Sequence, residues 1–336
     1  MAKKTLESMH SVSIDDVWKY FSTATIIKDF MLKDGYKPTF FQNNQVLATV
    51  WERPSLRTRV SFETGFQALG GGVITLKAYP PNAADIIFKE DVRDQANVLE
   101  SMCDLVMART YSHETISKLG AAMNIPLING MSDMAHPVQQ LTDLFTILEH
   151  KGKLEGLKVA YMGEGTGNTC QDWLIAAASV GMNFVLATPD YSQHKLLQDL
   201  DFGMPDQAWV DEAQKRAAQT GATITFTNDP IAAAKDADVI YTDSWIAYDV
   251  PAEKEKANEI REIFLPYQVN LDLLKLAPNA MVMHCQPMYR GFEITEEVTS
   301  HPQCKVSPEA ENRYHLQKGV MVELLKPGVG EYSHSH

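Results

Sequence analysis

The sequence predicts an α/β protein of two domains, each a mainly parallel sheet covered by helices on both faces. The chain has 336 residues, which is too long for one ordinary hydrophobic core and suits two domains of about 150 residues each. Short apolar runs rich in β-branched residues alternate along it with amphipathic stretches of about 10–15 residues, a pattern typical of parallel sheets.

The predicted strands of the first half are Gln45–Trp51, Gly72–Leu76, Asp104–Ala108 and Pro126–Ile128. Those of the second half are Leu157–Met162, Phe184–Ala187, Thr223–Phe226, Asp238–Thr242 and Met281–His284. Helices are expected between them at Thr58–Leu69, Val92–Met102, Val138–His150, Cys170–Val180 and Gln207–Gln219. Ligands of open parallel sheets bind at the carboxyl ends of strands, so we expect functional residues in the loops that follow the strands.

The alternation breaks at His150–Gly156. We therefore expect a first domain over residues 1–150 and a second over residues 151–310. The remaining segment, residues 311–336, contains most of a last helix expected over Glu309–Leu325. We expect that helix to pack back on the first domain.

Composition and charge exclude several classes of function. The chain has 45% hydrophobic and 22% charged residues, as a globular protein does, and a formal charge of −13. Such a charge argues against nucleic acid or an anionic membrane as a partner. No apolar run approaches the roughly 18 residues that span a bilayer. The two lysines near the N-terminus precede no apolar stretch, as a secretory signal would require, so we expect a cytoplasmic enzyme.

The four cysteines form no metal-binding pattern. Their positions are Cys103, Cys170, Cys285 and Cys304, and none belongs to a CxxC pair. We expect free thiols, no structural metal and no disulfide framework.

The strongest candidate site is Ser55–Arg59, directly after the first strand. Ser55 is a good N-cap, and the unpaired amides of a helix N-terminus attract anions. Arg57 and Arg59 place two cations where the helix dipole is already positive, which is unfavourable unless an anion is bound there. The alternative is a capped helix with two solvated arginines.

Further polar residues follow other strands. Arg109 ends a predicted strand, and His136 and Gln139 lie where a helix begins. A neutral imidazole or an amide can donate a hydrogen bond to a carbonyl oxygen without adding charge. Taken singly, His136 reads more simply as a structural histidine and Arg109 as a surface arginine.

A third segment is His284–Gly291, after the last predicted strand. Cys285 suits either a nucleophile or a small packing residue. We predict that it is not a covalent nucleophile, because His284 ends a strand on the opposite face and no other base is evident. Arg290 could clamp an anion that the first domain holds.

Together these segments resemble the aspartate/ornithine carbamoyltransferase family. Its signatures are S-T/L-R-T-R, a strand-terminal arginine, H-P-x-Q, H-C-L-P or H-P-L-P, and E-A-E-N-R. The matching positions, in the same order over nearly the full length, are Ser55–Arg59, Arg109, His136–Gln139, His284–Pro287 and Glu309–Arg313.

The resemblance implies transfer of the carbamoyl group of carbamoyl phosphate to an amine, without metal or organic cofactor. The residues implied for carbamoyl phosphate are Ser55, Leu56, Arg57, Thr58, Arg59, Arg109, His136, Gln139, Gln286 and Arg290. Of these, Ser55, Arg57, Thr58 and Arg59 would hold the phosphate, and Arg109, His136 and Gln139 the carbamoyl end, with Arg290 reaching from the second domain. Thr58, Arg109 and His136 would donate to the oxyanion, and the arginines would stabilise the departing phosphate. The residues implied for catalysis are Arg57, Thr58, Arg109, His136, Cys285 and Arg290. It also implies homotrimers, or multiples of trimers, whose sites share a loop, here within Lys77–Asp94.

The residues implied for the amine are Asn168, Asp243, Trp245 and Cys285. The acceptor motifs depart from those of ornithine enzymes, because no S-M-G follows Asp243–Trp245 and Gln286 replaces the usual leucine. We therefore expect a diamine such as putrescine slightly ahead of ornithine, with another amine also open. Asp249 would repel an acceptor carboxylate, which favours the diamine.

Two rival classes remain. Gly163–Gly167 follows a strand and suggests a nucleotide-dependent dehydrogenase, but its glycines lack the G-x-G-x-x-G spacing. A catalytically silent family member acting as a binding subunit is the other. The complete set of phosphate-side residues argues against it.

Overall fold

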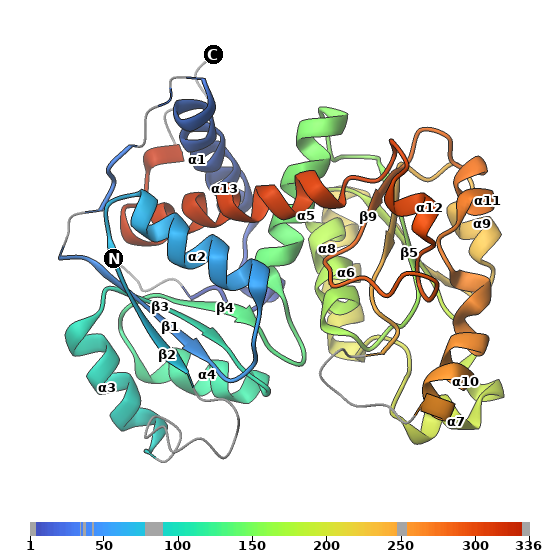
Figure 1. Cartoon of the computed structure of the whole chain (residues 1–336), viewed down its shortest axis with the longest axis horizontal. Coiled ribbons are helices and arrows are strands. Elements are labelled where there is room, and N and C mark those ends of the chain that lie inside the picture. Colours follow the sequence, from blue (N-terminus) through green and yellow to red (C-terminus); the bar gives the residue numbers. More distant parts are fainter. Residues whose placement is uncertain are drawn as a thin grey trace. The chain divides into compact units, whose positions relative to one another are not determined.

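The chain divides into two units, one made of Met1–Phe145 with Glu311–His336 and the other of Thr146–Ala310. We analysed a computed structural model. It describes residues 5–330, apart from residue 34 and residues 36–37, 42–43, 78–89 and 247–253. Each unit holds a parallel sheet covered by helices on both faces, so the predicted fold class is confirmed (Figure 1).

The sheet of the first unit has the strand order β2-β1-β3-β4, and all its pairings are parallel. Its strands are β1 (Val46–Trp51), β2 (Gly72–Lys77), β3 (Leu105–Arg109) and β4 (Leu127–Met131). The helices along this part of the chain are α1 (Ile14–Leu32), α2 (Leu56–Ala68), α3 (Val92–Met102), α4 (His113–Ala122) and α5 (Pro137–Lys151). Since β2 and β3 flank β1, the chain reverses its winding between β1 and β3, where open α/β sheets bind ligands.

Alternate residues of these strands face opposite layers of helices. Ala48 and Val50 of β1 join a buried cluster with Leu99 of α3 and Leu119 of α4. Thr49 faces the other side, where its hydroxyl donates to Glu63 of α2 at 3.2 Å. The sheet is therefore buried on both sides, which explains why its strands are continuous apolar runs.

The sheet of the second unit has the order β7-β6-β5-β8-β9, again with parallel pairing throughout. Its strands are β5 (Lys158–Met162), β6 (Asn183–Ala187), β7 (Ile224–Thr227), β8 (Val239–Thr242) and β9 (Met281–Met283). Its helices are α6 (Asn168–Ser179), α7 (Lys195–Asp199), α8 (Gln207–Thr220), α9 (Pro230–Ala234), α10 (Lys254–Phe264), α11 (Leu271–Lys275) and α12 (Glu296–Thr299). The reversal of winding here lies between β5 and β8.

Each face of this sheet also has its own core. Met162 and Ile240 pack in a cluster with Phe264 of α10. On the other face, the ring of Tyr241 stacks on Tyr161 and lies edge-on to Trp173 of α6, with ring centroids 5.6 Å and 5.2 Å away. None of the described helices is both long and apolar enough to cross a membrane.

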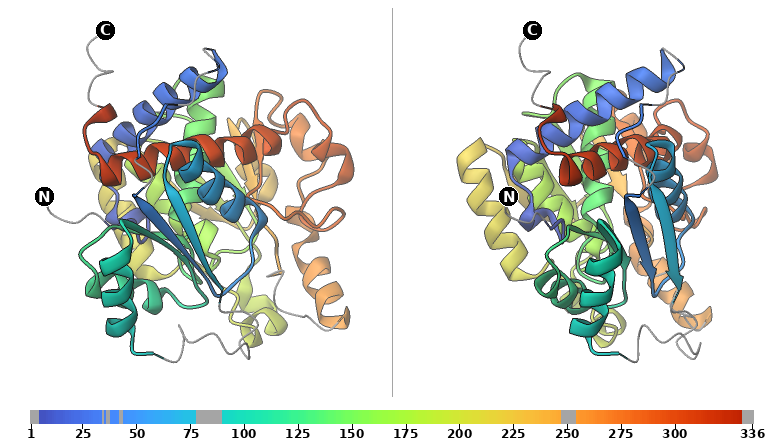
Figure 2. Two further views of the ribbon diagram at one scale, coloured as in Figure 1. Left: turned by 60° about the vertical axis from the view of Figure 1, so that its left-hand side comes forward. Right: turned by 90° about the vertical axis from the view of Figure 1, so that its left-hand side faces the viewer.

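The last helix, α13 (Val306–Leu325), lies against α1 within the first unit (Figures 1 and 2). Their closest approach is at Gly319. A Cβ atom there would lie 2.7 Å from the carbonyl oxygen of Tyr20 and 2.8 Å from the backbone nitrogen of Ala24. Backbone atoms cannot turn aside as a side chain can, so only glycine allows this contact.

We expect Gly319→Ala to lower the free energy of unfolding by about 1–3 kcal/mol, the usual cost of overpacking. The corresponding fall in melting temperature is roughly 2–4 °C per kcal/mol. Thermal unfolding of the purified variant measures it. The matched control is Gly203→Ala, whose Cβ would meet only Thr166 Cγ2, at 3.5 Å. Equal melting temperatures for the two variants would contradict the close packing of α1 and α13.

Candidate active site

The N-terminus of α2 carries the predicted anion site. Ser55 is its N-cap, and the Ser55 hydroxyl accepts a hydrogen bond from the backbone N–H of Thr58 at 3.3 Å. The first turn contains no acidic residue. Backbone N–H groups at this end have no intrahelical acceptors, and the dipole is positive there. The site therefore attracts an anion. Leu56, the first residue of the helix, has a side chain that is 72% exposed.

The two arginines of this turn differ in their partners. Arg59 pairs with Glu63 one turn later, at 3.2 Å, and Glu63 also accepts from the hydroxyls of Thr49 and Thr75. Arg59 is therefore linked through Glu63 to Thr49 of β1 and Thr75 of β2. Among the residues that the structure describes, no carboxylate pairs with Arg57. A partly buried guanidinium without a carboxylate, at a helix N-terminus, is a suitable phosphate ligand.

Arg313 contacts these predicted residues, although the sequence reasoning gave it no role. Its side chain is 2% exposed and reaches α2 and α5 from α13. It donates to Thr58 Oγ1 at 3.0 Å and to Gln139 Oε1. Gln139 in turn donates to Asp143 at 2.7 Å. The E-A-E-N-R motif contains Arg313 and was the signal available, but the motif alone gave it no role.

His136 lies among the positive charges. It is buried, and its pKa is lowered well below the ordinary 6.5, first by burial and then by the charges of Arg313, Arg109 and Arg57. Arg109 is 4% exposed and donates to the carbonyl of Gly130 at 3.4 Å. We call His136, Arg57, Arg109 and Arg313, together with Thr58 and Gln139, the cationic cluster. It brings residues at or just after the ends of β1, β3 and β4 together with Arg313 of α13.

The depressed pKa of His136 should make the fold acid-sensitive. Below about pH 6.5 this histidine binds a proton in the unfolded chain but not in the folded chain. The stability that the neutral ring contributes is therefore fully present above that pH. It is lost as pH falls toward the folded pKa, by up to about 2 kcal/mol at pH 5. Urea unfolding at pH 7.5 and at pH 5 should therefore show a smaller fall in the free energy of unfolding for His136→Gln than for the wild type. Parallel curves for the two proteins would contradict a neutral His136.

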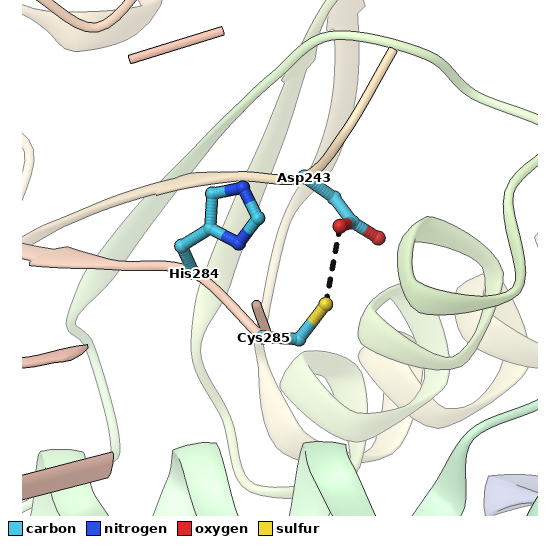
Figure 3. A group of neighbouring side chains, drawn as sticks. All are labelled: Asp243, His284 and Cys285. Carbon is cyan, nitrogen blue, oxygen red and sulfur yellow. Dashed lines mark hydrogen bonds between the residues drawn. The ribbon is translucent and has the colours of Figure 1, made fainter. Parts of the chain in front are cut away.

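The second unit contributes a different group, at the ends of β8 and β9. The thiol of Cys285 donates to Asp243 Oδ1 at 3.1 Å, and Figure 3 shows this contact. The same oxygen accepts from the backbone N–H of Ser244 at 2.8 Å. The resemblance implied that Asp243 and Cys285 serve one acceptor, and the structure places them in contact.

Asp243, His284 and Cys285 each offer one ligand atom within 4.8 Å of the others. The geometry nevertheless does not suit a metal ion. His284 Nδ1 accepts from the backbone N–H of Gln286 at 2.8 Å, and Nε2 lies 3.1 Å from Glu293 Oε1. Both ring nitrogens are therefore engaged, and a metal would have to displace one of these partners.

The engaged ring of His284 also bears on the Cys285 thiol. His284 has no nitrogen left to take the thiol proton, which instead points at Asp243. We expect Cys285→Ser to keep measurable turnover, within about tenfold of wild type, since a hydroxyl can still donate to Asp243. Steady-state rates test this. Mass spectrometric trapping of a carbamoyl thioester on Cys285 would contradict it.

The remaining acceptor candidates occupy different environments. Asn168 is the first residue of α6 and accepts from Thr169 Oγ1 at 3.2 Å. Trp245 is 2% exposed and stacks on Phe264, with ring centroids 5.5 Å apart. It also lies over Gly163, whose Cβ would be 3.2 Å from the indole. Trp245 therefore supports the loop after β8 from the core.

The last two candidates follow β9. Gln286 has a φ of 54°, in the left-handed region. Arg290 is half exposed, and its Nε lies 2.9 Å from Glu296 Oε2 in a surface ion pair. Such pairs contribute little to stability. Arg290 therefore differs from Arg313, which is buried and contacts Thr58 and Gln139.

These two groups define a class of protein. The cationic cluster suits a phosphorylated substrate with a carbonyl that becomes an oxyanion, and Asp243 suits an amine. The family model for the carbamoyl-P binding domain of aspartate/ornithine carbamoyltransferases matches residues 4–149, and that for the Asp/Orn binding domain matches residues 155–324. The chain belongs to the aspartate/ornithine carbamoyltransferase family and is an enzyme of the carbamoyltransferase class.

Similar proteins share one name. An ornithine carbamoyltransferase of Pyrococcus abyssi is 40% identical over 314 residues, 93% of this chain and 92% of the relative. The anabolic ornithine carbamoyltransferase of Pyrococcus furiosus is 39% identical over 328 residues, 97% of each chain. A solved ornithine carbamoyltransferase structure from Pyrococcus furiosus superposes with a TM-score of 0.87, at 36% identity and 98% coverage of both chains.

These comparisons correct the expected acceptor. We predicted a diamine such as putrescine, but relatives at about 40% identity over most of the chain are ornithine carbamoyltransferases. The prediction of putrescine as the preferred acceptor is wrong. It depended in part on the missing S-M-G and on Asp249. Backbone N–H groups can bind an acceptor carboxylate whatever side chains they carry, and residues 247–253 lie outside the described residues.

Proposed function

We propose that this enzyme transfers the carbamoyl group of carbamoyl phosphate to ornithine, giving citrulline and phosphate. The observation that carries the proposal is the cationic cluster around a neutral His136. The names of the relatives support ornithine as the acceptor. No metal or organic cofactor enters the proposed mechanism.

In the proposed mechanism the first unit binds carbamoyl phosphate. Arg57, Arg59 and the α2 amides bind the phosphate, with Ser55 fixing the turn. Thr58, Arg109 and His136 donate to the carbonyl oxygen as negative charge develops on it. A neutral imidazole carries one N–H group, so His136 can donate this hydrogen bond without first binding a proton. Gln139 and Arg313 hold the carbamoyl end.

The second unit binds the amine in this proposal. Asp243 pairs with the ammonium of ornithine that is not carbamoylated, which orients the neutral attacking amine. Cys285 and Asn168 line the acceptor, Trp245 supports the loop from below, and Gln286 contacts the carbamoyl group. The roles of Leu56 and Arg290 rest on the resemblance alone.

We also propose a homotrimer or multiple of trimers in the cytoplasm. In such an assembly Lys77–Asp94 of one subunit would complete the neighbouring site. Residues 78–89 of that segment lie outside the described residues. The described cysteines are free thiols, which suits a reducing compartment. Sedimentation of the purified protein tests the trimer.

The test of the reaction is a steady-state assay of ureido product with carbamoyl phosphate and ornithine, putrescine or aspartate. We expect the highest kcat/KM with ornithine. No product with any amine, together with intact binding of carbamoyl phosphate, would instead identify a silent binding protein.

A further inference from the structure

Glu293 is a buried carboxylate to which no role has been given. Its side chain is fully buried, in the loop between β9 and α12. Its Oε1 accepts from the backbone N–H of Tyr289 at 2.6 Å and lies 3.1 Å from His284 Nε2. A carboxylate is costly to bury, so its place calls for a specific task.

The hydrogen bonds assign the tautomer of His284. Nδ1 accepts from the backbone N–H of Gln286 at 2.8 Å, so it carries no hydrogen in that bond. The neutral ring must then carry its hydrogen on Nε2, which donates to Glu293. The carboxylate thus fixes both the tautomer and the orientation of the ring, as it does for histidines elsewhere in proteins.

This chain of bonds determines the shape of the turn at Cys285–Pro287. The backbone N–H of Gln286, a residue held at a φ of 54°, is bound by the ring that Glu293 orients. The same turn touches the loop after β8 twice. Cys285 donates to Asp243 at 3.1 Å, and Ser244 Oγ donates to the carbonyl of Pro287 at 3.0 Å.

We propose that Glu293 is a positioning residue for the acceptor: through His284 it holds the Cys285–Pro287 turn so that Cys285 and Asp243 meet. The proposal rests on the proposed function for its kinetic consequence. If the His284 ring loses its acceptor, it can rotate or take the other tautomer. The Gln286 N–H then loses its partner, and the thiol leaves Asp243.

The geometry is tested without any turnover. Long-range ¹H–¹⁵N correlation spectra of ¹⁵N-histidine-labelled wild type, assigned with His284→Gln, report the tautomer of His284. We expect Nε2–H in the wild type and in Glu293→Gln, whose amide oxygen can still accept. We expect Glu293→Ala to lose that pattern. A hydrogen on Nδ1 in the wild type would overturn the proposal.

The consequence is tested by kinetics, with ornithine or with whichever amine the wild type carbamoylates best. For Glu293→Ala we expect kcat/KM for the amine to fall at least tenfold, with the KM for carbamoyl phosphate changed less than threefold. Glu293→Gln should restore most of the loss. The control is Glu297→Ala, an exposed carboxylate nearby, which should match wild type.

The outcomes separate the two proposals. A wild type that ignores ornithine but carbamoylates another amine contradicts ornithine as acceptor and leaves the role of Glu293 to be measured with that amine. Equal losses on both substrates, or an unaffected amine kcat/KM in folded Glu293→Ala, would overturn the positioning role. If Glu293→Ala does not fold, the tautomer in the wild type and the rates of Glu293→Gln decide.

Discussion

Arg57→Ala is expected to lower kcat/KM for carbamoyl phosphate by roughly 10- to 150-fold, or about 1.5–3 kcal/mol, while the melting temperature stays near that of wild type. Among the described residues no carboxylate pairs with Arg57, so its removal strands no protein charge. In the proposed mechanism the lost interaction is a charge-assisted contact with the bound phosphate. Steady-state kinetics and thermal unfolding together measure both parts.

The matched control is Lys118→Ala, which removes a cation from a surface ion pair with Glu114. We expect less than about a threefold change, as for other exposed pairs. A loss in Lys118→Ala as large as that of Arg57→Ala would indicate an effect of net charge and not of a phosphate contact. Normal kinetics with a much lower melting temperature for Arg57→Ala would make Arg57 a structural arginine.

Asp243→Asn is expected to raise the KM for ornithine at least tenfold and to change that for carbamoyl phosphate little. The substitution keeps the acceptor oxygen for Cys285 and Ser244. It removes the charge that, in the proposed mechanism, pairs with the ammonium of the amine. A lost charge-assisted contact costs about 1.5–3 kcal/mol. The control is Asp272→Asn, a solvent-exposed carboxylate paired with Lys275.

An unchanged KM for ornithine in Asp243→Asn would contradict the role of this carboxylate. An equal rise for both substrates would instead indicate a general disturbance of the loop after β8. The two losses predicted for Arg57 and Asp243 should therefore fall on different substrates. That separation follows from the proposal that Arg57 binds carbamoyl phosphate and Asp243 binds the amine.

The order and type of the elements could be predicted because local pattern determines them. The nine strands predicted from apolar runs agree with β1 to β9 within a few residues, including Val46–Trp51 and Val239–Thr242. Parallel strands buried on both faces leave a strong signal. Ends of elements are less certain, as where α2 begins at Leu56 instead of Thr58.

Most members of the cationic cluster could be predicted because they stand in short segments at strand ends. Arg57, Arg109 and His136 were all identified from such segments. Arg313 could not be given a role, because it acts across a long separation in sequence. Arg313 reaches Thr58, 255 positions away in the chain. The sequence around a residue in the middle of a helix does not show which distant side chain that residue will contact.

The acceptor was predicted wrongly for a different reason. Specificity for ornithine against a diamine depends on how an α-carboxylate is bound, and backbone groups can do this without a recognisable side-chain motif. The loss of S-M-G therefore removes a familiar signal but does not by itself exclude a binding site for the α-carboxylate. Overall similarity to ornithine carbamoyltransferases outweighs one missing tripeptide.

Transfer to ornithine is tested most directly by a competition in one tube. The wild-type enzyme is supplied with ¹³C-carbamoyl phosphate and equal concentrations of ornithine, putrescine and aspartate, and the labelled products are identified by mass. We expect labelled citrulline to dominate from the earliest time point. Labelled N-carbamoylputrescine or carbamoyl aspartate as the main product would contradict the proposed acceptor.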